Sequence, residues 1–249
     1  MKRTLSSPLR LSCGLALILC AAANLAAAPD SALLKNLIAQ LGSDNPQLRD
    51  EARVQLMGLQ RADLPALRAA ALAQSPLLPG QVEQLREVVT QVYLSGEDYH
   101  KNPADPRGFA GLRWGMDVLN ETFSTGIPVQ ERIPGFPAFR VLQTGDIITQ
   151  VMEHPKTPLQ HIADFINVVH LMQHGDVVHL SILRSGRTMS VALPLDFVPV
   201  DLDQHVVEDG WIDNWILARN QRAEDYWNSE FWAIDPSVAT TQQTTAVQP

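Results

Sequence analysis

The spacing of apolar residues changes between residues 95 and 107, and this change constrains the fold more than any other feature of the chain. Before it, apolar residues recur with the helical period, and after it they form short β-branched runs typical of strands. The sequence therefore predicts a helical region followed by a β-rich region, which is an α+β fold.

The stretch from Ser31 to about Leu94 predicts about four helices. In the first, leucine and isoleucine form one apolar stripe that Gly42 terminates. Pro46 suits the first turn of the second, and Asp63 can cap the third. The three later helices are expected from Asn45-Pro46 to Gly58, from Leu64 to Ala73 and from Gln81 to Tyr93.

Residues 41–52 followed by 62–67 resemble a HEAT-type helical repeat. A single repeat cannot bury its own apolar face, so the helices are expected to pack on each other, on the next domain or on a partner. Both a helical spacer and a protein-docking surface are compatible with this pattern.

Short β-branched runs fill residues 129–151 and 177–195. Ser185-Gly186 is expected to turn the chain between strands at Val178–Leu183 and Thr188–Leu193. Between the two runs, residues 158–172 predict a helix. Strands with one long and one short helix make a compact β-rich domain.

The tail beyond Asp201 holds four of the five tryptophans. Trp211, Ile212, Trp215 and Ile216 predict an apolar stripe on a helix that extends to about Tyr226. Rings of this size are costly to leave in water, so they are expected to dock on their own chain, on a partner or in a groove. The Ser, Thr and Gln run beyond Pro236 predicts disorder.

The first 28 residues have the order of a signal peptide: basic residues, then an apolar run, then small residues. The apolar run is shorter than the about 20 residues of a membrane-spanning helix. We therefore expect an exported protein, periplasmic or secreted. Cys13 and Cys20 both lie in this leader, so thiol and disulfide chemistry is excluded from the mature chain.

Removal of the leader leaves 16 basic side chains against 27 acidic ones. Such an acidic chain is a poor partner for acidic polymers, which argues against nucleic acid and anionic lipid. The acidic residues of the aromatic tail also lack the basic belt of a membrane-surface helix, so membrane association is not expected after signal removal.

Three stretches, in order, resemble a PDZ domain of the bacterial exported-protease type. They are Arg107-Gly108-Phe109-Ala110-Gly111-Leu112; Pro134–Ala138 with Leu142–Val151, which contains Gly145-Asp146-Ile147-Ile148; and Gly175–Arg187. One difference is that Phe139-Arg140-Val141 occupies the place of a small Ala and Gly pair. The expected organisation is a signal peptide (1–28), a HEAT-like region (29–95), a linker (96–106), a PDZ-like domain (107–198), an aromatic extension (199–235) and a tail (236–249).

The resemblance implies a groove for a peptide end. Gly108, Phe109, Ala110 and Gly111 would form a loop whose amides bind a terminal carboxylate, and the strand from Leu112 would pair with the peptide. Leu112 with Ile162, Phe165 and Ile166 would line the pocket for the last side chain. The three helix residues can equally be ordinary core.

Catalytic motifs are absent from the sequence. It contains no Gly-x-Ser-x-Gly, Ser-x-x-Lys or His-Glu-x-x-His element and no glycine-rich phosphate loop, so neither an enzyme nor a cofactor is expected. His170 and His174 have a spacing that can hold a metal ion, but Gly175 indicates that His174 ends the helix, and no metal site is predicted.

These observations lead us to expect an exported, non-enzymatic adaptor that captures C-terminal or extended peptide segments by β-augmentation. Two other interpretations remain open. The protein could be a regulatory or substrate-delivery subunit of a separate envelope protease or chaperone, or a structural scaffold with a vestigial groove.

Overall fold

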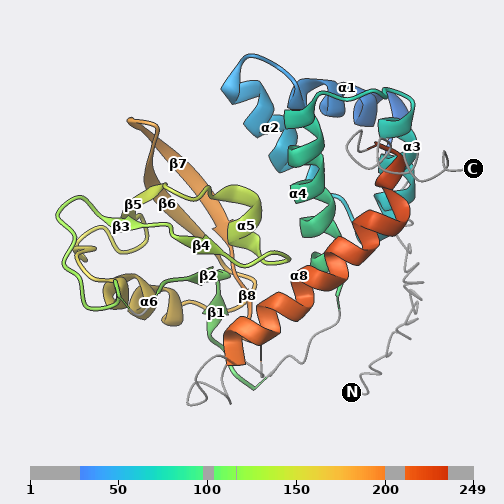
Figure 1. Ribbon diagram of the computed structural model, residues 1–249. Helices are drawn as coiled ribbons and strands as arrows, with labels where there is room; N and C mark the ends of the chain where they lie inside the picture. Colours follow the sequence, from blue (N-terminus) through green and yellow to red (C-terminus); the bar gives the residue numbers. More distant parts are fainter. Residues whose placement is uncertain (1–28, 98–103, 116, 200–210, 235–249) are drawn as a thin grey trace, which may run out of the picture.

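The computed structural model describes residues 29–97, 104–115, 117–199 and 211–234. The expected signal peptide and the tail beyond Pro236 lie outside these residues. Helices fill the first part of the chain and strands with two further helices fill the middle (Figure 1). The mixed α+β class and the order of its parts are confirmed.

The helical region contains α1 (Ser31–Leu41), α2 (Pro46–Leu56), the 3₁₀ turn η1 (Arg61–Asp63), α3 (Leu64–Leu72) and α4 (Pro79–Ser95). Polar side chains start the first two helices, since Asp30 accepts the Ala32 N–H and Asn45 accepts the Gln47 N–H. The four predicted helices are therefore present, with ends that shift by one or two residues.

The β-rich region is built around an antiparallel sheet in the order β3-β5-β6-β7. Its strands are β3 (Ile127–Pro128), β5 (Ile147–Val151), β6 (Val177–Arg184) and β7 (Arg187–Pro194). Ser185 and Gly186 take positive φ angles in the turn from β6 to β7, which confirms the predicted hairpin. Two short pairs complete the strands: β1 (Gly108–Phe109) with β8 (Asp196–Phe197), and β2 (Leu112–Arg113) with β4 (Glu131–Arg132).

Two helices belong to this region, α5 (Pro137–Val141) and α6 (Ile162–His170). The α6 helix is shorter than the expected 158–172, and its buried face contributes to the core under the sheet. His174 does not end α6, contrary to the prediction. Its N–H bonds to the Pro106 carbonyl and its ring stacks on Phe197, because the chain has already turned away from the helix axis.

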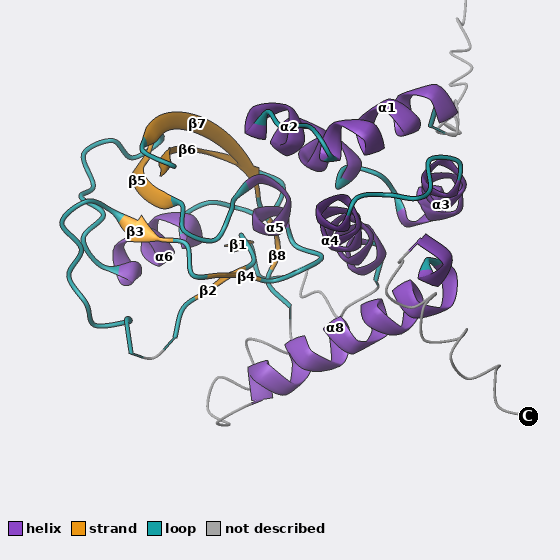
Figure 2. Cartoon of the chain, turned by 45° about the horizontal axis from the view of Figure 1, so that its top comes forward, coloured by secondary structure: helices purple, strands orange, loops and turns teal. Residues whose placement is uncertain are grey.

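The aromatic tail forms α8 (Trp211–Glu230) and the 3₁₀ turn η2 (Trp232–Ile234). Figures 1 and 2 show α8 running beside both regions, with its first turns near the strands and its last turns near α3 and α4. Trp227, Phe231 and Ile234 are buried in the helical core. The described part of the tail thus docks on its own chain. None of the helices that the described residues form combines the length and the apolar character needed for a membrane span.

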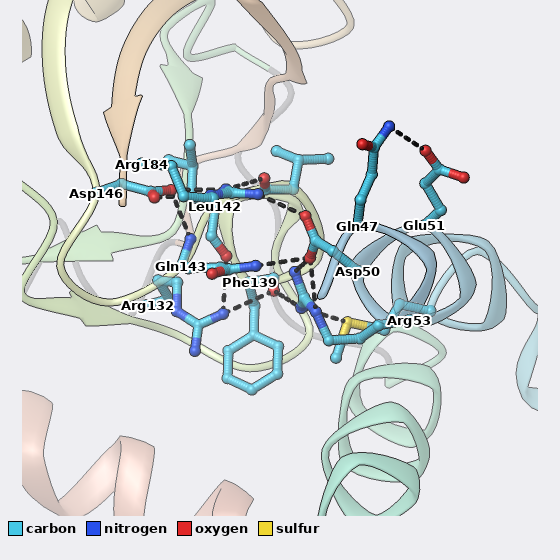
Figure 3. Close-up of polar contacts among 12 residues, drawn as sticks. Gln47, Asp50, Glu51, Arg53, Arg132, Phe139, Leu142, Gln143, Asp146 and Arg184 are labelled. Carbon is cyan, nitrogen blue, oxygen red and sulfur yellow. Dashed lines mark hydrogen bonds and ion pairs between the residues drawn. The ribbon is translucent and has the colours of Figure 1, made fainter. Parts of the chain in front are cut away.

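Polar contacts join the two regions at α2 (Figure 3). Arg184 on β6 bonds both to Asp50 of α2, at 2.6 Å, and to the buried Asp146, at 2.7 Å. Arg53 Nη1 donates to the Phe139 carbonyl, and the Phe139 ring enters the helical core. The Phe139-Arg140-Val141 sequence, where a small Ala and Gly pair was expected, is therefore one of the segments that contact the helices.

Candidate functional site

The loop between β1 and β2 is held at its base by the end of α6. The Gly108 N–H donates to the Met172 carbonyl at 2.9 Å, and β1 pairs with β8. A Cβ at Gly108 would lie 2.4 Å from Leu195 Cδ1, so any larger residue would displace the Leu195 side chain. The loop is therefore fixed between α6 and the last strand.

The carbonyls and the amides of this loop face different surroundings. The Ala110 carbonyl accepts the Ala138 N–H at 2.9 Å, and the Gly111 carbonyl accepts the Ile133 N–H at 2.8 Å. By contrast, the amides of Ala110 and Gly111 make no hydrogen bond to any described residue. Two adjacent donors are thus left for a ligand or water.

The register of β2 adds a third donor. Because the Ile133 N–H bonds to the Gly111 carbonyl, Leu112 and Arg132 form a non-hydrogen-bonded pair. The N–H of Leu112 therefore points away from β4. No described strand pairs with that edge of β2, which leaves it available to an added strand.

Gly111 has a φ of +79°, which is in the left-handed region. A residue in this region allows successive N–H groups to converge on one space, as an anion-binding nest requires. The nearby Arg107 is paired with Asp105, whose hydrogen bonds from Arg107 lower the pKa of its carboxyl group. The backbone, more than side-chain charge, would therefore attract an anion here.

The predicted pocket residues fall into two groups. Ile162 and Phe165 are 0% and 2% exposed and belong to the core under the sheet. Leu112 and Ile166 are half-buried and pack against the same core from its edge. Of the proposed lining, Leu112 and Ile166 therefore keep surface that a ligand could cover.

Two residues near the loop were not predicted as site residues. Trp114, directly after β2, donates its indole N–H to the Pro128 carbonyl and lies 5.9 Å from the Phe165 ring. Phe136 is fully buried behind the loop and meets Phe109 edge-on at 5.0 Å. Trp114 is the one tryptophan outside the tail and directly follows the predicted strand from Leu112, so the sequence could have indicated it as a site residue. The position of Phe136 depends on tertiary packing.

The histidine pair is split between a helix and a loop, since His170 ends α6 and His174 lies beyond it. Across the residues with described positions, no three metal-ligating side chains gather.

No family model matches the chain, and no curated protein matches it. Among solved structures, it is similar to one titled "Crystal structure of the serine endoprotease from Yersinia pestis", with 23% identity and a TM-score of 0.30. The match covers 38% of this chain and 30% of that one, so it spans less than a third of that protein. A TM-score this low does not establish a shared fold.

Proposed function

We propose that this protein is an exported, non-enzymatic adaptor whose PDZ-type groove binds the C-terminal ends of other proteins. One observation carries the proposal. The amides of Ala110 and Gly111 have no hydrogen-bond acceptor among the described residues, and they adjoin the Leu112 amide on an unpaired strand edge.

The three donors and the strand edge have separate tasks in this mechanism. The amides from Ala110 to Leu112 bind the two carboxylate oxygens of a chain end, where charge-assisted bonds are stronger than neutral ones. The peptide backbone extends the sheet along β2. Leu112 and Ile166 cover an apolar last side chain, so apolar chain ends are preferred.

Export and location are part of the proposal. They are supported by the basic, apolar and small order of the first 28 residues. The absence of catalytic sequence motifs supports a binding role. A regulatory or delivery subunit for a separate envelope protease or chaperone would use the same groove and would co-purify with that enzyme.

One observation favours the rival function of a structural scaffold. Trp114 contacts Phe165, and the Phe123 N–H bonds to the Gln160 carbonyl just before α6, so the segment after β2 lies along the start of that helix. A scaffold would need no further ligand at this position.

Peptide binding tests these alternatives directly. A library of random peptides with free C-termini should bind the full chain after removal of the leader, and amidated copies should bind at least about tenfold more weakly, because amidation removes the charge and one acceptor oxygen. Equal binding of both sets would exclude carboxylate recognition, and no binding of either set would favour the scaffold.

A groove variant locates the binding site. Ile166→Lys should abolish binding, because it places a charge on the apolar wall. Val177→Lys is the matched control, since Val177 is 42% exposed on β6, and it should bind as the unmodified chain does. Retained binding by the Ile166 variant would show that peptides bind at another surface.

A further inference from the structure

The backbone of the loop lies directly on Phe136. A Cβ at Gly111 would lie only 2.2 Å from the Phe136 Cβ, so the two backbones approach as closely as a glycine permits. Phe136 is fully buried, and the Phe109 ring packs on it from the loop. Movement of Phe136 would therefore move the loop amides.

Phe136 is in turn held by Arg219, a residue of α8. The Arg219 guanidinium lies 5.3 Å from the centre of the Phe136 ring and 4.7 Å from that of Trp215. Its Nη2 donates to the Pro134 carbonyl at 3.1 Å, in the same turn as Phe136. Arg219 is only 2% exposed, so a competing water shell is largely excluded.

The charge of Arg219 is balanced from the helical region. Its Nη1 lies 2.6 Å from Oε2 of Glu97, which follows α4. The neighbouring Arg222 also contacts Glu97, with Nε donating to Oε1 at 2.9 Å, but the Arg222 side chain is 48% exposed. A second ion pair, between Asp213 and Arg113, joins α8 to β2.

We propose that Arg219 is a positioning residue for the Gly108–Leu112 loop: through Phe136 it fixes the direction of the loop amides, so that α8 sets the affinity of the groove for chain ends. This inference rests on the proposed function. It gives α8, which lies outside the β-rich region, a role in recognition in addition to packing.

Arg219→Ala tests the inference, with Arg222→Ala as the matched control because both arginines contact Glu97. The dissociation constant of a free-C-terminus peptide that binds the unmodified chain should rise about tenfold in the Arg219 variant. It should change less than about twofold in the Arg222 variant, which loses an exposed ion pair. Binding is measured at a temperature where circular dichroism shows each variant to be folded.

A second readout separates positioning from loss of stability. The loop exchange is read at the amides of Ile133 and Ala138, which donate to the Gly111 and Ala110 carbonyls, and it should accelerate in Arg219→Ala while the amides of β6 and β7 stay protected. Arg219→Lys keeps the charge but loses the planar fork of donors, and it should recover part of the lost affinity. Unchanged affinity together with unchanged loop exchange in Arg219→Ala would overturn the inference, as would equal losses in the Arg222 control.

The exchange measurement needs no ligand. If the unmodified chain binds no peptide, the proposed function fails by itself, and the loop exchange of Arg219→Ala still decides whether α8 positions the loop.

Discussion

The two regions differ in where their cores come from. The main core of the β-rich region is built from residues between Ala110 and Leu195, and a smaller cluster joins Ile133 and Phe136 to Ile216 of α8. The core of the helical region also contains side chains from outside that region. Phe139 comes from α5, and Trp227, Phe231 and Ile234 come from the C-terminal segment. The main core of the β-rich region therefore depends less on the C-terminal segment than the core of the helical region does.

The difference follows from the geometry of the elements. In the β-rich region, a sheet and α6 cover each other's apolar faces. The four short helices do not bury all of their apolar faces on one another, and α8 and Phe139 cover the remaining apolar surface. The aromatic tail is thus a structural part of the helical region.

The largest effect is expected from truncating Trp227, the largest side chain that the C-terminal segment contributes to the helical core. Trp227 is 1% exposed and stacks on Phe231 with ring centres 5.2 Å apart. Trp227→Ala should lower the free energy of unfolding by about 4 kcal/mol, as large buried rings do when truncated. Hydrogen exchange should accelerate first in α3 and α4, with β6 and β7 less affected.

Trp232→Ala is the matched control, because Trp232 lies in the same segment but is 41% exposed. It should change the stability by less than about 0.5 kcal/mol. Uniform acceleration of exchange in both regions of the Trp227 variant would show that they unfold as one unit. The two cores would then not differ in how much their stability depends on the C-terminal segment.

A smaller effect is expected where the regions meet through charges. Arg184→Ala leaves Asp146, 1% exposed, with its bond from the Gln143 N–H but without its cation. Because an unpaired buried charge is costly, the free energy of unfolding in urea should fall by about 3 kcal/mol. Arg187→Ala, at the exposed end of the same hairpin, should be nearly neutral; similar losses in both variants would contradict this account.

The smallest effect concerns the start of α6. A hydrogen bond from the backbone N–H of His161, together with one from that of Gln160, holds the pKa of the Asp164 carboxyl group below its ordinary value. Because the folded-state pKa is the lower one, the stabilisation is complete above the unfolded-state pKa and is lost as the pH falls through the folded-state pKa. Protection of the first α6 amides should therefore weaken in acid.

Asp164→Asn should remove this acid dependence and cost about 1 kcal/mol locally at neutral pH. Asp225→Asn, on the exposed face of α8, is the control and should preserve the dependence. NMR-detected exchange between about pH 2 and 6 measures both variants. An unchanged acid profile in the Asp164 variant would assign the dependence to another group.

Local signals were sufficient for the elements. Caps and apolar periodicity located α1 to α4, and Ser185-Gly186 located the hairpin, because each depends on residues within a few positions of one another. The glycines of the 107–112 stretch also indicated the site loop, since positive φ at Gly111 is a local property of the backbone.

The sequence by itself thus determined the four helices of the first region and the β6–β7 hairpin, and it indicated where glycines allow the backbone to turn. Only the tertiary structure decided that Ile162 and Phe165 are core, that Phe139 enters the helices, and that Arg219 lies behind the loop. The physical reason is that apolar burial is non-directional: a pattern shows that a face must be covered, but the choice of covering partner depends on the shape of the whole chain.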